Sequence, residues 1–462
     1  MSVHTNTNKG EIIMNNIIIN MPKGAAAIID TLQSNGFEAY LVGGCVRDSI
    51  LNRPVHDWDI TTSATPDEMK EVFFDSNILE TGIAHGTLTI QSIDGFYECT
   101  TYRIDGEYSD GRQPDEKTFT DSLVKDLSRR DFTINAMAYN DKNGLIDPFG
   151  GMKDIGNGII RCVGDPMERF KEDALRIMRA LRFSAQLMFT IDIDTMEAAF
   201  KLKRILKNVS MERINGEFCK IMICEEPGWI LEQCKLIFKE FIPEISSMIG
   251  FLQNNPYHVY DVWDHTFMVV TNCDMPNPKD LILRLAAFFH DIGKPHCYQS
   301  DPDGTRHFRG HGKVSAEMTD KIMQRLKFDN KTREKVVELV YYHNVTLEIT
   351  DKCIKRWLNK IGEEQFKRLL SLRRADILGQ SPINQDVRLE KVNTLEEILE
   401  DVLEQQACFS IKNLAVNGDD LIAAGMKPGK EIGAVLNQML DLVLNDECAN
   451  DKNTLFKAVG IE

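Results

Sequence analysis

The sequence predicts an α/β domain with a mixed sheet at its amino-terminal end, followed by a series of all-helical domains. Between about residues 21 and 150, short β-type runs alternate with helical stretches. Beyond the turn-rich segment 147–151, the apolar residues follow a helical repeat almost throughout. A chain of 462 residues is also too long for one core, so two to four domains are expected.

The first domain, which we call the head, is expected to span residues 21–150. Runs of β-branched, aromatic and alternating polar residues predict strands over 39–42, 87–93 and 96–102. A helix is expected over 65–74. Residues 1–20 are expected to form a poorly ordered lead-in to this domain.

The first long helix after the head has clear start signals. Asp165 can cap its free N–H groups, Pro166 suits the first helical position, and Glu168 stands where a capping box needs an acid. Apolar residues then recur at three- and four-residue spacing, which predicts a buried stripe along one face of the helix. The stripe consists of Phe170, Ala174, Met178, Leu181 and Ala185.

Three helical regions should follow the head: a neck and body over 151–250, a His-rich region over 256–380, and a tail over 381–462. The formal net charge of −16 argues against a protein that coats nucleic acid through a uniform positive field. The segment 161–207 is nevertheless locally basic, and any RNA contact is expected there. The alternative is a solvated basic helix face.

The cysteines and the apolar runs indicate a cytoplasmic protein. Eleven cysteines are scattered without a Cys-x-x-Cys pair, so reduced and mostly buried thiols are expected rather than a disulfide framework. No apolar run is long enough to span a bilayer, and the amino-terminal stretch lacks the features of a signal peptide. No membrane partner is expected.

A glycine pair and two aspartates suggest a phosphate and metal site in the head. Gly43 and Gly44 end a predicted strand, where phosphate oxygens can approach backbone N–H groups, and Arg47 can add a charged contact. A simple tight turn is the alternative. If 57–59 is a strand, Asp57 and Asp59 project to the same face and together suit Mg²⁺. Asp-x-Asp is otherwise common on surfaces.

Five ordered segments, 43–62, 129–137, 147–151, 172–176 and 210–214, resemble the motifs of bacterial-type (class II) tRNA nucleotidyltransferases. These CCA-adding enzymes belong to the DNA polymerase beta-like superfamily, and the resemblance covers roughly residues 36–220. It implies addition of CCA to the tRNA 3′ end from CTP and ATP, with Asp57 and Asp59 as ligands of Mg²⁺.

The same resemblance implies further nucleotide-binding residues. Arg130 and Asp131 would address the ribose, and Asn135 and Arg179 would lie near the nucleotide. An exposed ion pair is the alternative for the first two, and packing against the body is the alternative for Arg179. Glu98, on a predicted neighbouring strand, is a candidate third catalytic carboxylate or else an ordinary surface residue.

Asp173 and Arg176 offer a physical account of base choice. On one helix, residues three apart are neighbours, and Asp accepts hydrogen bonds whereas Arg donates them. Cytosine and adenine both present a donor beside an acceptor on the pairing edge, while guanine and uracil present the reverse order. A fixed Asp/Arg pair can therefore select C and A without a template. A surface salt bridge is the alternative.

The segment 103–119 helps to distinguish between related enzymes, because it resembles the flexible loop of those that can add the terminal A. The run 59–66 looks more like the CCA-adding enzymes than like bacterial poly(A) polymerases. An A-adding enzyme or a poly(A) polymerase stays open as an alternative, because it shares these motifs.

The His-rich region resembles the HD superfamily of metal-dependent phosphohydrolases. His265, the pair His290–Asp291, and Asp376 match its His…His-Asp…Asp pattern, and His311 and His343 fall where two-metal members place further ligands. A buried core histidine is the alternative for the last two. The metal, whether Ni²⁺, Mn²⁺, Co²⁺ or Mg²⁺, is left open, as is the oligomeric state. By family analogy the substrate is a 2′,3′-cyclic phosphate or 2′-phosphate on damaged RNA.

Two alternative functions, each of another class, compete with nucleotide addition. One is an HD phosphohydrolase whose head merely binds RNA or nucleotide, although such a head has little need of a carboxylate pair. The other is a non-enzymatic RNA-binding protein, which explains neither of the two metal-type constellations.

Overall fold

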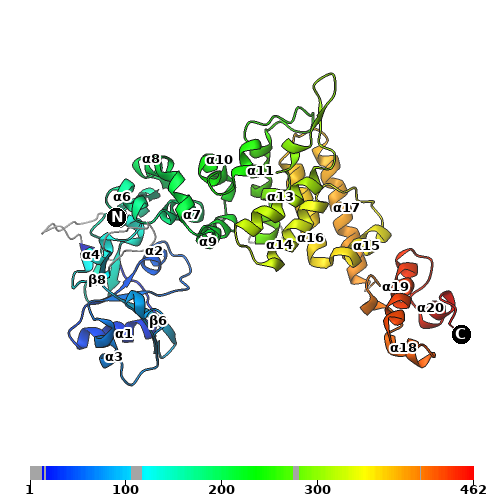
Figure 1. The fold of residues 1–462 in the computed structure, drawn as a ribbon. Helices are drawn as coiled ribbons and strands as arrows, with labels where there is room; N and C mark the ends of the chain where they lie inside the picture. The colour runs from blue at the N-terminus through cyan, green and yellow to red at the C-terminus, as the bar shows by residue number, and fades with distance from the viewer. Residues whose placement is uncertain (1–12, 15–16, 106–116, 274–279, 406, 462) are drawn as a thin grey trace. The chain divides into compact units, whose positions relative to one another are not determined.

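The computed structural model describes residues 13–14, 17–105, 117–273, 280–405 and 407–461 (Figure 1). It divides into two compact units. The first comprises Met1–Ile221 with Cys234–Phe241, and the second comprises Met222–Gln233 with Ile242–Glu462. The four-region division at 150, 250 and 380 stays a prediction.

The first unit contains the predicted mixed sheet, which has eight strands. Strands β3 and β6 pair in parallel, and all other neighbours are antiparallel. In spatial order the strands are β1 (Ile13–Met14), β10 (Gly144–Ile146), β9 (Ala138–Asn140), β2 (Ala39–Val42), β3 (Ile60–Thr62), β6 (Gly95–Thr101), β5 (Thr87–Ser92) and β4 (Ile78–Leu79). The predicted strands correspond to β2, β5 and β6.

Short helices accompany the sheet and share its core. Helix α1 (Lys23–Ser34) buries Ile28, Ile29 and Leu32 against sheet residues such as Leu41 and Ile60. The predicted helix over 65–74 is α3 (Pro66–Val72), which starts with a capping box between Thr65 and Glu68. The other helices before residue 158 are α2 (Gly44–Ile50), α4 (Leu123–Ser128) and α5 (Gly151–Asn157).

The expectation of an unstructured lead-in over 1–20 was wrong for part of that segment. Residues Ile13–Met14 form β1 and pair with β10 at one edge of the sheet. Ile19 is buried in the core of the first unit. The segment carries too few residues for a strand pattern of its own, so its order comes from pairing with an existing sheet.

The predicted long helix from Asp165 is two helices. Asp165 caps α6 (Pro166–Glu172) by accepting from the N–H of Met167 at 2.8 Å, whereas Glu168 pairs with Lys171 instead of completing a capping box. Asp173 then adopts an extended conformation, with φ −143° and ψ 104°, before α7 (Leu175–Leu187). The predicted apolar stripe is buried nevertheless, since Phe170 and the later members lie inward from both helices.

Outside the eight-stranded sheet, the first unit has two small strand pairs. These are antiparallel β7 (Arg103–Asp105) with β8 (Lys117–Phe119), and parallel β11 (Ile159–Ile160) with β12 (Thr190–Ile191). Its helices are α8 (Ile193–Leu202), α9 (Met211–Met222) and the end of α10 (Pro227–Phe238). The basic side chains predicted for RNA contact at 201–207 lie on α8 and the turn after it, where Lys201, Arg204 and Lys207 are exposed.

The second unit is helical apart from the short pair β13 (Gln299–Ser300) and β14 (Arg306–His307). Its helices are α11 (Val262–Thr271), α12 (Leu281–Phe289), α13 (His311–Arg325), α14 (Asn330–Tyr342), α15 (Asp351–Ile361), α16 (Glu363–Leu378), α17 (Gln385–Glu404), α18 (Gly418–Ala423), α19 (Lys430–Leu444) and α20 (Lys452–Ala458). The last three bury a separate small core around Met439 and Leu455. No helix in the described ranges is both long and apolar enough to cross a bilayer.

Candidate active site and metal centre

Two of the predicted carboxylates lie side by side, one just before strand β3 and the other in the middle of its partner β6. Asp59 immediately precedes β3, and Glu98 lies in β6, one residue before Cys99. Ile60 pairs with Cys99 in the parallel pair of β3 and β6. The residues that precede them, Asp59 and Glu98, are therefore neighbours on the face of the sheet opposite to that of Ile60 and Cys99. Both residues remain accessible to solvent.

Asp57 lies two residues before Asp59, outside the strand that the sequence led us to expect at 57–59. Its charge still reaches Asp59. Partial burial raises the pKa of Asp59, the Glu98 and Asp57 carboxylates raise it further, and the Arg130 guanidinium opposes them. None of the three carboxylates forms an ion pair with a described residue.

Three unpaired carboxylates in one place suit a hard divalent cation such as Mg²⁺. They do not form a closed cluster of ligand atoms within 4.8 Å, in contrast to the histidine groups described below. Since like charges repel, a cation is what would draw these oxygens together. The acidic set therefore fits the Mg²⁺ site that the sequence predicts.

The glycine turn beside these carboxylates holds an arginine close. Gly43 has a φ of +80°, and a side chain added there would lie 3.1 Å from Nη1 of Arg130. Gly44 begins α2, so the turn leads directly from β2 into that helix. The predicted tight turn is thus present, and it leaves room for the Arg130 guanidinium.

Arg47 points into the protein and is 4% exposed. Its Nε and Nη2 donate to the Asp48 carboxylate at 2.9 and 2.7 Å, and its Nη1 donates to Oδ1 of Asn135 at 2.6 Å. Arg47 therefore fixes Asn135, and a direct contact of Arg47 with phosphate stays a prediction.

Asp131 links Asn135 to α7. Its Oδ1 accepts from the Asn135 amide at 3.1 Å, and its Oδ2 accepts from Nε of Arg179 at 2.6 Å. Burial alone would raise the pKa of Asp131, but the Arg179 charge and the Asn135 hydrogen bond outweigh it and lower the pKa to about 2. The two predicted ribose and nucleotide residues thus form one ion pair, in which Asp131 is buried and Arg179 is partly exposed.

We expect Asp131→Asn to destabilise the first unit by about 2 kcal/mol at neutral pH. The folded-state pKa lies below the usual 3.8, so this stability is present above pH 4 and is lost as the pH falls through about 2. Urea unfolding at pH 7 and pH 3 measures the difference, which should shrink at the lower pH. Asp75→Asn, at an exposed position, serves as control, and an equal effect of both variants would contradict the prediction.

The side chains of Asp173 and Arg176 do not pair with each other as neighbours on one continuous helix, which is the arrangement that the sequence predicts. Because the helix breaks at Asp173, its Oδ2 instead accepts from Nη2 of Arg213 at 2.7 Å. Arg176 donates to Oε2 of Glu172 at 2.6 Å and to the Arg129 carbonyl at 2.9 Å. The proposed Asp/Arg edge for base recognition is therefore not preassembled in this structure.

Sequence reasoning assigned no role to Arg213 or Phe183. Arg213 lies within the segment 210–214, whose motif was the available signal. The Phe183 ring lies 4.9 Å from the guanidinium of Arg47, 5.3 Å from that of Arg179 and 4.1 Å from that of Arg182. No pattern in the sequence signals this aromatic contact, because the arginines come from two helices. Most of the predicted loop over 103–119 lies outside the described residues.

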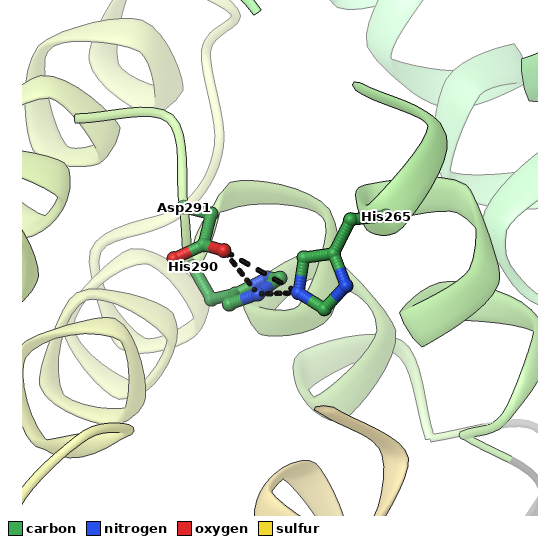
Figure 2. Close-up of side chains that lie close together, drawn as sticks. All are labelled: His265, His290 and Asp291. Atoms are coloured by element: carbon green, nitrogen blue, oxygen red, sulfur yellow. Dashed lines mark hydrogen bonds and ion pairs between the residues drawn. The ribbon is translucent and has the colours of Figure 1, made fainter. Parts of the chain in front are cut away.

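The predicted HD residues come together in the second unit. His265 on α11, His290 at the end of α12, and Asp291 form one buried group (Figure 2). Nε2 of His265 lies 3.2 Å from Nε2 of His290, and Oδ2 of Asp291 lies 3.1 Å from the latter. Asp376 on α16 approaches the same group, with Oδ1 3.0 Å from Nε2 of His265.

His311 and His343 form a second group with the same aspartate. Their Nε2 atoms lie 3.0 Å apart, and Oδ1 of Asp291 lies 3.3 Å from the first and 3.7 Å from the second. Asp291 thus faces one histidine pair with each of its oxygens. The structure places both histidines beside Asp291, and their role as metal ligands stays a prediction.

The four imidazoles present their Nε2 atoms to these groups. Each Nδ1 lies near a backbone carbonyl, which only accepts: Gly379 for His265, Ala287 for His290, Phe308 for His311 and Val340 for His343. A proton on each Nδ1 satisfies these contacts and leaves each Nε2 as the ring atom that can bind a second proton or a cation. Such an arrangement suits divalent cations.

The bridging aspartate also fits a metal ligand. Oδ2 of Asp291 is buried and forms an ion pair with Nζ of Lys294 at 2.6 Å. Despite burial, the charges of His290 and Lys294 keep the pKa of Asp291 well below its usual value. Burial would lower the pKa of His265, but Asp291 and Asp376 raise it to about 9.

Comparison with known proteins identifies the family. Residues 39–161 match the poly(A) polymerase head domain family, residues 188–248 match a family described as a probable RNA- and SrmB-binding site of polymerase A, and residues 311–459 match a tRNA nucleotidyltransferase domain 2 family. Over 438 residues the chain is 34% identical to the CCA-adding enzyme of Lactobacillus helveticus, covering 94% of this chain and 95% of that one. The chain belongs to the CCA-adding enzyme family.

Other members of the CCA-adding family agree with this assignment. The Ligilactobacillus salivarius enzyme is 32% identical over 457 residues, covering 96% of this chain and 97% of its own. The crystal structure of the Bacillus stearothermophilus CCA-adding enzyme in complex with CTP matches 95% of this chain and 98% of that one, at 26% identity and a TM-score of 0.67. The predicted family, and its α/β head followed by helical regions, are confirmed.

Proposed function

We propose that this chain adds CCA to the 3′ end of tRNA, using CTP and ATP and releasing pyrophosphate. The observation that carries the proposal is the neighbouring pair of Asp59, just before β3, and Glu98, in the middle of β6, with Asp57 two residues before Asp59. The family relationship and the CTP-bound structure of a relative support the substrates. Free thiols at all eleven cysteines are in keeping with a cytoplasmic location.

Different residues of the chain serve different parts of nucleotidyl transfer. Mg²⁺ held by Asp57, Asp59 and Glu98 would favour the ionised 3′-hydroxyl and neutralise charge on the departing pyrophosphate. Arg130, whose side chain is partly exposed against the glycine turn, can contact phosphate or ribose. Arg47 orients Asn135, which in turn holds Asp131 in place.

The test offers purified protein a tRNA that lacks CCA, with one labelled nucleotide at a time and then in combination. Addition of two C residues followed by one A supports the proposal. Addition of A alone, or of many A residues, identifies an A-adding enzyme or a poly(A) polymerase. No addition of any nucleotide refutes nucleotidyl transfer altogether.

Base choice requires Asp173 to exchange partners. Asp173 is paired with Arg213, and its carboxylate becomes available to a base only when that ion pair opens or shifts.

We expect Asp173→Asn to lower the preference for C over U about tenfold or more, because an amide can also donate to the uracil carbonyl. Single-nucleotide incorporation of C and U measures this ratio. Glu197→Gln, in an exposed pair on α8, is the matched control. An unchanged ratio in Asp173→Asn removes this residue from base selection.

We also propose a phosphohydrolase activity for the second unit. The specific observation is the aspartate that faces two histidine pairs, His265 with His290 and His311 with His343. Two divalent cations at such a centre can hold a phosphate and activate water. Metal-dependent release of phosphate from RNA ends that carry a 2′-phosphate or 2′,3′-cyclic phosphate tests this activity. Absence of release with Ni²⁺, Mn²⁺, Co²⁺ and Mg²⁺ refutes it.

A further inference from the structure

A fully buried carboxylate, that of Asp126 on α4, contacts strand β3 and two consecutive arginines, Arg129 and Arg130. Its side chain is 0% exposed. Despite burial, which raises it, the pKa of Asp126 lies below its ordinary value because of the charges of Arg130 and Arg129. The group is therefore ionised at neutral pH, and a buried charge of this kind is stable only where it is paired.

The two oxygens of Asp126 hold the two arginines differently. Oδ1 accepts from Nε and Nη2 of Arg129 at 2.9 and 2.8 Å, and from the backbone N–H of Arg103 at 3.3 Å. Oδ2 accepts from the Thr61 hydroxyl at 3.3 Å and from Nη2 of Arg130 at 3.5 Å. Arg129 is thus held by short charge-assisted hydrogen bonds, whereas Arg130 is held by a single longer one.

Contacts on both sides fix the position of the Asp126 carboxylate. Thr61 belongs to β3 and lies two residues after Asp59, so Oδ2 is tied to the strand that follows a candidate metal ligand. The carbonyl of Arg129 accepts from Nη2 of Arg176 at 2.9 Å, so the residue that pairs with Oδ1 is tied to α7. A carboxylate fixed in this way can impose a position on the more exposed Arg130.

Arg130 keeps hydrogen-bond donors for a further partner. A guanidinium carries five N–H donors, and the buried Nε of Arg130 forms no hydrogen bond with a described residue. Nη1 of Arg130 lies 3.1 Å from the position that a side chain on Gly43 would take. The Arg130 charge also opposes the burial that raises the pKa of Asp59. The unused donors therefore lie beside the glycine turn and within electrostatic reach of the acidic set.

We propose that Asp126 is a positioning residue for nucleotide addition, whose buried carboxylate holds the Arg130 guanidinium against the glycine turn with its remaining donors free for the incoming nucleoside triphosphate. Asp126 contacts no substrate itself and acts through Arg130. The proposal rests on the nucleotide addition proposed above. The competing explanation is that Asp126 only secures the packing of α4 on β3 through Thr61.

Removing the Asp126 charge has two effects of opposite sign on nucleotide binding. The site gains one net positive charge, and this alone would strengthen binding of a triphosphate. Arg130 also loses the carboxylate that orients it, and a donor that must be ordered on binding weakens affinity. A positioning role therefore predicts weaker binding, whereas a role in charge balance alone predicts tighter binding.

The experiment uses the full chain and measures CTP binding by isothermal titration in Mg²⁺ without tRNA, and CTP addition to tRNA that lacks CCA. The variants are Asp126→Asn, Arg130→Gln and the two combined. Thr61→Val removes the hydroxyl contact with the same carboxylate and leaves both arginines in place. Asp121→Asn, at an exposed position just before α4, is the matched control. Thermal unfolding verifies that each variant is folded.

We expect Asp126→Asn to weaken CTP binding and to raise the KM for CTP about tenfold, with kcat and the KM for tRNA changed less than about threefold. The combined variant should bind CTP about as weakly as Arg130→Gln, because Asp126 acts through that guanidinium. Thr61→Val and Asp121→Asn should bind CTP as the parent does. A defect of packing alone would instead appear in Thr61→Val as well.

Tighter or unchanged CTP binding in Asp126→Asn overturns the proposal, as does an equal loss in Thr61→Val or a combined loss equal to the product of the two single losses. If Asp126→Asn does not fold, Arg130→Lys decides, since an ammonium keeps the charge but lacks the planar fork. A loss close to that of Arg130→Gln supports the proposal, and parental CTP binding overturns it. The expected losses of CTP binding in a chain that adds no nucleotide to tRNA would refute nucleotide addition and leave the role of Asp126 intact.

Discussion

Replacing Asp57 and Asp59 together by asparagine is expected to lower cytidine addition to tRNA by at least about a thousandfold. Asparagine keeps the size of each side chain but removes the charges that would hold Mg²⁺. Burial, together with the charges of Glu98 and Asp57, raises the pKa of Asp59, and a bound cation would relieve this repulsion. Labelled CTP incorporation measures the loss.

Single substitutions refine this prediction. Glu98→Gln should reduce addition less than the double variant, because Glu98 is the neighbour of the pair on β6 rather than a member of it. Asp75→Asn, an exposed position in the same unit, controls for loss of one acidic group. If the double variant incorporates CTP at a rate within a few-fold of the parent, the head's carboxylates are not its catalytic metal ligands.

The sheet could be predicted where the local pattern was strong. Strands β2, β5 and β6 follow the expected runs, since each carries enough apolar and β-branched residues to signal itself. Strand β1 has only two residues, and its pairing with β10 depends on a partner more than a hundred residues away. Local sequence cannot report such a partner.

The break between α6 and α7 illustrates a second limit. No glycine or proline marks residues 173–174, and the apolar spacing continues through them. Asp173 leaves the helix while its carboxylate accepts from the Leu175 N–H at 3.0 Å and from Arg213. The second contact spans forty residues. It therefore changes local structure in a way that helical periodicity alone could not predict.

At the histidine centre, the sequence predicted the residues but not how they pair. Sequence spacing could not separate ligands from core residues for His311 and His343, because they lie on different helices from His265. Packing of α11 to α14 brings all four imidazoles to Asp291. The residue types were predictable from a pattern, but their pairing about the two oxygens of one aspartate required the fold.

Because Asp291 faces both histidine pairs, Asp291→Asn is expected to abolish binding of two metal equivalents rather than one. His343→Ala, which removes a ligand from the second group alone, should retain about one equivalent. Affinity should also rise with pH towards about 9, since protons compete with the metal for His265. Metal content and Mn²⁺ titration measure these values, and cytidine addition by the same preparations reports that the head is folded. The exposed change Asp303→Asn is the control. Loss of only one equivalent in Asp291→Asn would show that the aspartate serves a single site, and the two histidine pairs would then act independently.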